Sequence, residues 1–390
     1  MSKKQKIYTI NSILFLLLLL GLWWLSLLFV VLVLLYFISL KLIHLIAYPF
    51  LKKIVKGLFL FLFIFSVAIS IKLLLFDIYK IPSSSMNDTL FTNDVIVVNK
   101  LRYGPKLPRS PFDIPWVNIA FYFNANARER IKEHWWSYKR LSGYSHIKNG
   151  DILVYEYFNK SNFLVKRCIG IAGDTLLIEN GRTILNQKTV SFSNNIKKRY
   201  RFKVVDKKQM YKELDRLSID KRMIRNLDAN GFLMCVFNKN DYKNLEASPF
   251  IDSLQQITAS YSQKDELFAK PKDSLWTKDN LGPIVIPKKG MSIILNSFNY
   301  EVYKTAINSH EKSVKIQYKN GEFLINEKKA TTYTFKQNYH FMMGDNRNGS
   351  YDSRFIGFIP EQNIIGKVQC VLWSNYQDKF QWDRLFKKVE

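Results

Sequence analysis

Residues 344–354 read Gly-Asp-Asn-Arg-Asn-Gly-Ser-Tyr-Asp-Ser-Arg, so that Asp345 and Asp352 alternate with Arg347 and Arg354. Two carboxylates this close together are one arrangement found in glycosidases. Adjacent guanidinium groups, however, form strong hydrogen-bonded ion pairs with carboxylates. We therefore expect these four charges to neutralise one another and to tie the loop together, with Asp352 nearest to the reacting groups.

Two segments earlier in the chain carry groups that can react. Residues 81–90 read Ile-Pro-Ser-Ser-Ser-Met-Asn-Asp-Thr-Leu, and residues 165–174 read Val-Lys-Arg-Cys-Ile-Gly-Ile-Ala-Gly-Asp. The chain contains no Gly-x-Ser-x-Gly elbow, no His-Glu-x-x-His and no glycine-rich phosphate loop. Its five histidines stand in no recognisable catalytic setting: His44, His134, His146, His310 and His340. In a serine hydrolase without a histidine base, lysine is the known substitute.

Lys166 has the surroundings that such a base needs. A lysine accepts a proton only when neutral, and its ordinary pKa of about 10.4 keeps it charged at neutral pH. Burial favours the neutral form and lowers that pKa. In an alternating strand Lys166 shares the apolar face of Leu164 and Cys168, while Arg167 points the other way. Taken alone, Lys166 would be an exposed strand lysine and the three serines a helix cap.

Taken together, these three segments closely resemble signal peptidase I, the serine–lysine leader peptidase of bacteria. Residues 150–155, Gly-Asp-Ile-Leu-Val-Tyr, add a fourth match in the expected order. The family patterns are roughly Pro-Ser-x-Ser-Met-x-Pro-Thr-Leu, Lys-Arg-x-x-Gly-x-Pro-Gly-Asp and Gly-Asp-Asn-Arg-x-x-Ser-x-Asp-Ser-Arg. The last is the most specific, and the chain matches it at every fixed position. Residues 282–290 resemble the branch of the family found in Bacteroidetes-type bacteria.

The resemblance covers the membrane segments, residues 81–174 and residues from about 282 to 373, but not most of the segment between. The chain departs from the patterns at three positions. Ser84 replaces a glycine, and Asp88 and Ala172 each replace a proline. None of these changes removes a reacting atom.

The resemblance also implies a role for each site residue. Ser85 would be the nucleophile and Lys166 its base. The backbone N–H of Ser85 and the hydroxyl of Ser83 would form the oxyanion hole, and Ser350 would orient the amine of Lys166. Met86 would pack beneath the site. The family implies no metal and no organic cofactor, and its substrates are preproteins that carry a signal peptide with small residues at the first and third positions before the cut.

The soluble part of the chain is rich in short β-like runs. We expect strands at residues 95–98, 152–155, 163–169, 284–286, 292–295 and 368–372, because these are rich in β-branched and aromatic residues. Asn-Gly pairs at 180–181 and 320–321 predict two hairpins. The predicted fold is therefore mainly β: an antiparallel catalytic domain of the signal-peptidase type, with an α/β insertion and three preceding transmembrane helices.

Two segments interrupt the β pattern. Residues 199–280 alternate strand-like and helix-like stretches and predict the insertion, which divides the catalytic domain into residues 77–198 and 281–390. Residues 127–141 predict a basic amphipathic helix, either on the membrane surface or packed on its own domain.

The N-terminal residues predict three membrane spans. Residues 7–40 carry no charge and would form a helix of roughly 50 Å, too long for one crossing of a core about 30 Å thick. Two spans joined near residues 21–24 fit better, and residues 57–76 form a third. By the positive-inside rule the lysines before the first span and in the linker up to residue 56 are cytoplasmic: Lys3, Lys4, Lys6, Lys52, Lys53 and Lys56. The catalytic domain would then lie outside the cytoplasm, at the inner membrane of a bacterium.

The net charge of +26 is spread along the chain and favours anionic lipid over nucleic acid as a partner. The three cysteines allow one disulfide at most, and no Cys-x-x-Cys pair suggests zinc. Secretion machinery is a further candidate partner. The alternatives are a catalytically silent envelope protein that binds peptides or secretion proteins, and an autoprotease of the repressor-cleaving type, which the membrane spans disfavour.

Overall fold

The structure is a computed structural model that describes residues 3–116, 119, 123, 135–157, 162–217, 219, 223–228, 230–262 and 266–390. The amphipathic helix predicted at 127–141 lies outside the described residues as far as residue 134. The rest of that segment, residues 135–141, is not helical.

Three N-terminal helices precede the β domain: α1 (Lys3–Leu19), α2 (Trp23–His44) and α3 (Pro49–Ser70). The predicted break falls at Gly21, whose φ of 72° suits a turn. α3 continues as a π-helical turn (Ile71–Leu75) and leads straight into the first strand.

Two of these helices are long and apolar enough to cross a membrane, namely Trp23–His44 and the continuous stretch Pro49–Leu75. The apolar part of α1, Tyr8–Leu19, is shorter than the roughly 20 residues that a span needs. The described residues therefore contain two helices of spanning length, where the sequence predicted three.

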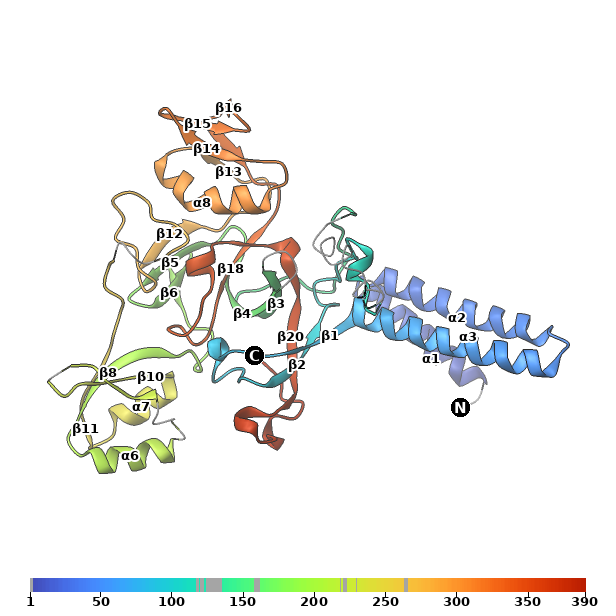
Figure 1. Cartoon of the computed structure of the whole chain (residues 1–390), viewed down its shortest axis with the longest axis horizontal. Coiled ribbons are helices and arrows are strands. Elements are labelled where there is room, and N and C mark those ends of the chain that lie inside the picture. Colours follow the sequence, from blue (N-terminus) through green and yellow to red (C-terminus); the bar gives the residue numbers. More distant parts are fainter. Residues whose placement is uncertain are drawn as a thin grey trace.

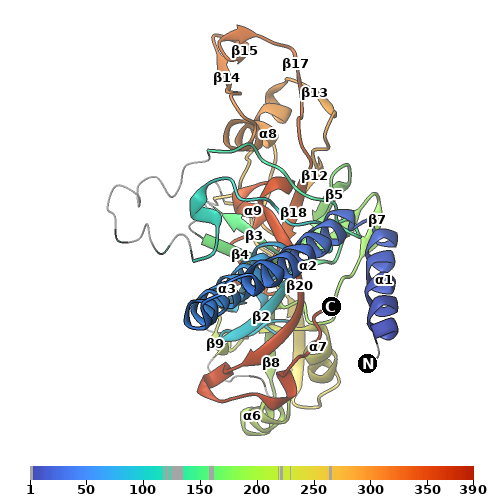
Figure 2. The ribbon, with the colours of Figure 1, turned by 90° about the vertical axis from the view of Figure 1, so that its right-hand side faces the viewer.

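α2 and α3 extend away from the β domain as a pair, and α1 runs in another direction and contacts the start of α2, where Ser26 Oγ donates to Leu14 O at 3.5 Å (Figure 1, Figure 2). The turn between α1 and α2 is bound to the segment before β3: Trp24 Nε1 donates to Ser142 O at 2.9 Å, and Ser142 Oγ donates to Gly21 O at 2.8 Å. The start of α2 and the end of α3 consequently lie at the same end of the pair, next to the β domain.

The central sheet has seven strands in the order β1-β2-β20-β3-β4-β18-β19, and each neighbouring pair is antiparallel. Its members are β1 (Phe76–Lys80), β2 (Asp94–Asn99), β20 (Ile364–Ser374), β3 (Ile152–Tyr157), β4 (Asn162–Gly170), β18 (Tyr339–Met343) and β19 (Ile359–Pro360). Apolar side chains cover both faces of this sheet, which explains the nearly continuous apolar runs in its central strands.

Both predicted Asn-Gly hairpins are confirmed. β5 (Thr175–Glu179) pairs with β6 (Arg182–Leu185), and β14 (Ile316–Lys319) pairs with β15 (Glu322–Ile325). All four turn residues have positive φ, as a two-residue hairpin turn requires. The remaining elements of this region are β7 (Lys188–Val190), β12 (Leu281–Val285), β13 (Ser292–Ile294), α8 (Ser297–His310), β16 (Lys328–Lys329) and β17 (Thr332–Thr334).

The predicted insertion forms a separate α/β unit at the lower left of Figure 1. Its sheet has the order β11-β8-β10-β9, and its elements are β8 (Lys198–Val204), α6 (Lys207–Arg216), β9 (Arg225–Asn226), β10 (Leu233–Phe237), α7 (Lys239–Glu246) and β11 (Ile251–Gln256). The unit buries its own core around Phe202, Leu214 and Phe237. Phe268 and Trp276, near the end of the predicted insertion, instead pack into the core beneath β5 and β12.

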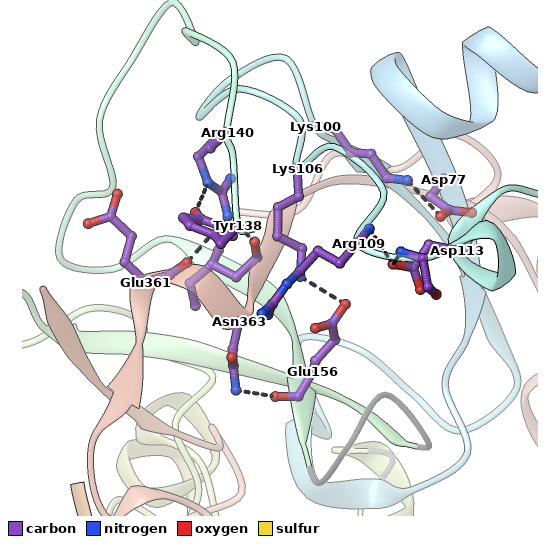
Figure 3. Close-up of polar contacts among 12 residues, drawn as sticks. Asp77, Lys100, Lys106, Arg109, Asp113, Tyr138, Arg140, Glu156, Glu361 and Asn363 are labelled. Atoms are coloured by element: carbon purple, nitrogen blue, oxygen red, sulfur yellow. Dashed lines mark hydrogen bonds and ion pairs between the residues drawn. The ribbon is translucent and has the colours of Figure 1, made fainter. Parts of the chain in front are cut away.

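A polar network fixes the segment after β2 on the central sheet (Figure 3). Lys106 Nζ pairs with Glu156 of β3 at 2.8 Å, and Arg140 Nη1 donates to Gly104 O at 2.7 Å. Burial lowers the pKa of Lys106, and the Glu156 carboxylate beside it acts in the opposite direction. Because these charges are matched within the network, we regard it as structural.

Candidate active site

Ser85 lies in a single 3-10 turn (Ser84–Met86) within the loop of residues 81–93, called the Ser85 loop here. Met86 and Leu90 are buried in the core between β2, β3 and β20, and they fix the base of this loop. Ser85 retains 9% of its exposure. Its Oγ accepts a hydrogen bond from Lys166 Nζ at 2.5 Å and lies 3.4 Å from Ser83 Oγ.

Lys166 comes from β4, where it is opposite Leu153 and only 3% exposed. Leu153 and Cys168 lie on the same sheet face as Lys166 and are fully buried. Lys166 therefore shares an apolar face with Cys168, as the alternation of the strand predicted. Burial lowers the pKa of Lys166 to about 8, although the negative charge of Asp352 acts against that shift. Among the nearby charges Asp352 has the largest effect on Lys166, and Arg354 acts in the same direction as burial. A substantial neutral fraction at mildly alkaline pH follows from this environment.

The loop of residues 344–354, called the Gly344 loop here, follows β18 and meets the Ser85 loop. Asp345 is buried and pairs with Arg167 through two hydrogen bonds, Nε to Oδ1 at 2.9 Å and Nη2 to Oδ2 at 2.7 Å. Thr89 Oγ1 also donates to Asp345 Oδ2 at 2.6 Å, and the amide of Asp345 contacts Met86 Sδ at 3.4 Å. Asp345 thereby joins the Ser85 loop to the strand that carries Lys166.

Asp352 forms the second buried pair. Arg354 donates to it through Nε and Nη2, both at 2.9 Å, and the amide of Gly344 donates at 3.0 Å. Asp352 also caps the short helix α9 (Ser353–Ile356). Burial alone would raise the pKa of Asp352, but the charge and hydrogen bonds of Arg354 outweigh it and hold the pKa below its usual value. Asp352 is therefore an anion at every pH where the protein is expected to work.

The expectation that all four charges of the Gly344 loop pair with one another needs correction. Arg347 is buried, yet none of the ion pairs among the described residues includes it, and its Nη1 contacts Met343 Sδ at 3.4 Å. Burial lowers the pKa of Arg347 to about 10, and the positive charge of Arg354 adds to this effect. Asp345 pairs instead with Arg167, which comes from a distant strand and not from the Gly344 loop.

Gly344 allows the two loops to approach closely. A Cβ on Gly344 would lie 2.3 Å from Ser350 Oγ and 2.5 Å from the carbonyl oxygen of Ser85, so no larger residue fits. Ser350 Oγ is buried and lies close enough to Asp352 to help lower the pKa of that carboxyl, and no hydrogen bond joins it to Lys166 within the described part of the chain. The predicted contact between Ser350 and the amine of Lys166 is thus not formed in this conformation.

Sequence reasoning missed several residues that hold the two loops together. The backbone amide of Asn346 donates to Ser85 O at 3.1 Å, and its Nδ2 donates to Ser84 O at 3.2 Å. The family patterns quoted above contain fixed residues at the positions of Asn346, Thr89 and Arg167. These fixed positions could have identified the three residues from the sequence. Ser84, the departure from the family pattern next to Ser85, is exposed.

The described residues contain no group of three histidine, cysteine or carboxylate side chains arranged to hold a metal. The three cysteines are free thiols. His310 and His340 are mostly buried, and burial lowers the pKa of each to about 4. Neither forms a hydrogen bond with Ser85 among the described contacts, so the lysine is the base within reach.

Comparison with known proteins agrees with this geometry. The family model described as signal peptidase, peptidase S26 matches residues 52–226 and 289–373, more than half of the chain. A signal peptidase I of Buchnera aphidicola is 24% identical over 313 residues, covering 80% of this chain and 74% of its own. A signal peptidase I of Helicobacter pylori is 22% identical over 326 residues, covering 79% and 84%. The chain belongs to the signal peptidase family, peptidase S26, and is a serine endopeptidase.

Proposed function

We propose that this protein is a membrane-bound type I signal peptidase that removes N-terminal signal peptides from exported preproteins with a Ser85–Lys166 dyad. The observation that carries the proposal is the 2.5 Å contact between Lys166 Nζ and Ser85 Oγ, made by a lysine that is 97% removed from solvent. A buried amine so close to a hydroxyl is poised to take its proton.

In the proposed reaction, neutral Lys166 accepts the proton of Ser85 Oγ while that oxygen attacks the scissile carbonyl carbon. The resulting oxyanion is stabilised by the backbone N–H of Ser85 and by the hydroxyl of Ser83. The protonated amine then gives its proton to the leaving nitrogen, and the peptide bond breaks to leave an ester on Ser85. A water molecule, deprotonated by Lys166, hydrolyses this ester and restores the dyad.

The remaining site residues support the dyad. Asp352 and Arg354 form a matched pair close to Lys166, which keeps the net charge beside the amine low. Ser350 is proposed to orient the amine once the hydroxyl of Ser85 has been consumed. Asp345 and Met86 hold the Ser85 loop on the sheet. Arg347 is a structural member of the same loop.

We also propose that the protein is a multi-pass protein of the bacterial cytoplasmic membrane, with its β domain outside the cytoplasm. Two helices of spanning length support this, as does the absence of any buried residue along α3, whose apolar side chains need lipid around them. The contact of Trp24 with Ser142 places the start of α2 beside the β domain, so that α2 and α3 can cross and return as a hairpin. Preproteins and the bilayer are the expected partners, and secretion machinery is a further candidate.

The proposal is tested by incubating the detergent-solubilised protein with a purified preprotein and sequencing the new N-terminus. We expect one cut, after a small-x-small pattern. The matched control is the same preprotein with bulky residues at the first and third positions before the cut, which should remain intact. If several preproteins stay uncut, the silent peptide-binding protein becomes the better explanation.

Cleavage should depend on pH through Lys166. Because the base must be neutral, kcat/KM should rise with pH and level off above an apparent pKa of about 8. The charge of Asp352 raises the pKa of Lys166, so Asp352→Asn should move this rise to lower pH. A pH–rate profile measured on both sides of that value decides the matter. If kcat/KM instead rises at the pH where an ordinary histidine or lysine titrates, and Asp352→Asn does not move that rise, Lys166 is not the base.

A further inference from the structure

In the part of the chain that the structure describes, the side chain of Asp88 joins the Ser85 loop to the α/β insertion. Asp88 Oδ1 pairs with Lys197 Nζ at 2.8 Å, and Asp88 Oδ2 accepts a hydrogen bond from Asn238 Nδ2 at 2.7 Å. Lys197 directly precedes β8, and Asn238 is the N-cap of α7. Both carboxylate oxygens are therefore held by residues that belong to, or adjoin, the insertion.

The amide of Asn238 can face Asp88 in one orientation only. Its Oδ1 accepts hydrogen bonds from the amides of Asn240 and Asp241, both at 2.9 Å, as an N-cap residue does. The oxygen is thus committed to the helix, and the NH₂ group is the end that points at Asp88. The first turn of α7 consequently serves as a rigid support for the contact.

Lys197 joins the same contact to the Gly344 loop. Its backbone amide donates to Asp345 O at 2.8 Å, and its carbonyl accepts from the amide of Arg347 at 3.2 Å. Asn346 lies between these two residues, and its backbone amide donates to the carbonyl oxygen of Ser85. The side chain of Lys197 therefore holds the Ser85 loop, and its backbone holds the Gly344 loop, which also contacts Ser85.

The backbone at Asp88 is compatible with this role and excludes proline. Asp88 has a φ of 72°, a conformation that Asp and Asn adopt more readily than other residues with a side chain. Proline is locked near −65° and could not replace it here without moving the loop. The ion pair with Lys197 is also largely shielded, with side chains 14% and 18% exposed, so it is stronger than a surface pair.

We propose that Asp88 is a positioning residue through which the insertion holds Ser85 in line with Lys166. The loop has other supports, such as Thr89 on Asp345, but these come from the catalytic domain itself. The effect on cleavage rests on the proposed function, whereas the mechanical link between insertion and loop does not.

The test uses the full-length protein in detergent and two readouts. Asn238→Asp retains a good helix cap but sets a further carboxylate against Asp88, beside that of Asp241, whose pKa burial and the charge of Asp88 already raise. We expect faster hydrogen exchange at the amides that are bonded within the Ser85 loop, namely those of Asn87, Thr89 and Leu90. We also expect kcat for a preprotein to fall roughly tenfold to a hundredfold, with KM little changed, because a small displacement of a reacting group costs about that much.

Two further variants make the test specific. Asp206→Ala removes the cap of α6 in the same unit but touches no residue of the Ser85 loop, so kcat and loop exchange should both stay at the wild-type level. The exchanged pair Asp88→Asn with Asn238→Asp restores an amide opposite a carboxylate, and Asn tolerates the positive φ. This double variant should recover most of the activity lost by Asn238→Asp.

Unchanged exchange of the Ser85 loop in Asn238→Asp would overturn the proposal, even if activity fell. Faster exchange with unaltered kcat would overturn the positioning role. Equal losses in Asp206→Ala and Asn238→Asp would also overturn it, since they would trace the effect to general weakening of the insertion. If the wild type cuts no preprotein, the proposed function fails, and the exchange comparison alone decides whether the link exists.

Discussion

Ser85→Ala and Lys166→Met should each give a folded protein that no longer cleaves a preprotein. Removing a nucleophile from a catalytic pair lowers kcat by at least about a thousandfold, and removing the base that serves it has a similar effect because the two act as a unit. Methionine preserves the apolar stem of Lys166 against Leu153 and Cys168, so the core around it should stay packed. The measurement is the rate of product formation at equal enzyme concentration.

Matched controls separate chemistry from folding. Ser191→Ala and Lys188→Met change the same residue types at exposed positions, Lys188 at the start of β7 and Ser191 just after it, and should retain full activity. Thermal unfolding should show that Lys166→Met is as stable as the wild type or slightly more so, because an amine that resists burial has been removed, and that Ser85→Ala is folded as well. The double variant should be no worse than either single variant. Full activity in Lys166→Met would exclude the proposed base.

Arg167→Met should produce the largest loss of stability. It leaves the carboxylate of Asp345 buried without its cation, and breaking a buried pair from one side costs about 3–5 kcal/mol in free energy of unfolding. At about 2–4 °C per kcal/mol for a domain of this size, Tm should fall by roughly 10 °C. Cleavage should weaken as well, since Asp345 no longer holds Thr89 against the sheet.

The matched control is Arg216→Met, which removes an exposed arginine from its pair with Glu213 on α6 and should leave Tm nearly unchanged. Replacing both members of the buried pair, as Arg167→Met with Asp345→Leu, should recover part of the lost stability because no unpaired charge remains. Equal Tm values for Arg167→Met and Arg216→Met would show that the buried pair contributes nothing to stability.

Local sequence was sufficient for several features. The hairpin at Asn180–Gly181 was predictable because its turn needs two residues with positive φ, and this preference belongs to the residues themselves. The strands around Val97, Val154 and Val368 were predictable from β-branched runs. The same holds for α2 and for the apolar part of α3. However, α3 begins at Pro49 and so includes Lys52, Lys53 and Lys56, which were predicted to lie in a linker, and α1 was predicted as a span that its apolar length does not reach.

The candidate site was only partly predictable. The motif spacing named Ser85 and Lys166, which lie 81 residues apart in the chain, and the structure brings them to 2.5 Å. Their catalytic roles remain predictions. The four charges of the Gly344 loop were expected to pair with one another, but of these only Asp352 and Arg354 form an ion pair with each other within the described residues, while packing brings Arg167 to Asp345 from 178 residues away.

The sequence by itself determined the secondary structure of the hairpins and apolar helices, the family, and the residue types at the site, because these depend on properties of short segments. Tertiary structure alone decided which charges pair, how far burial lowers the pKa of Lys166, and that Asp88 meets Lys197 and Asn238. Ion pairing and desolvation depend on which distant segments exclude water from a group, and no local pattern contains that information.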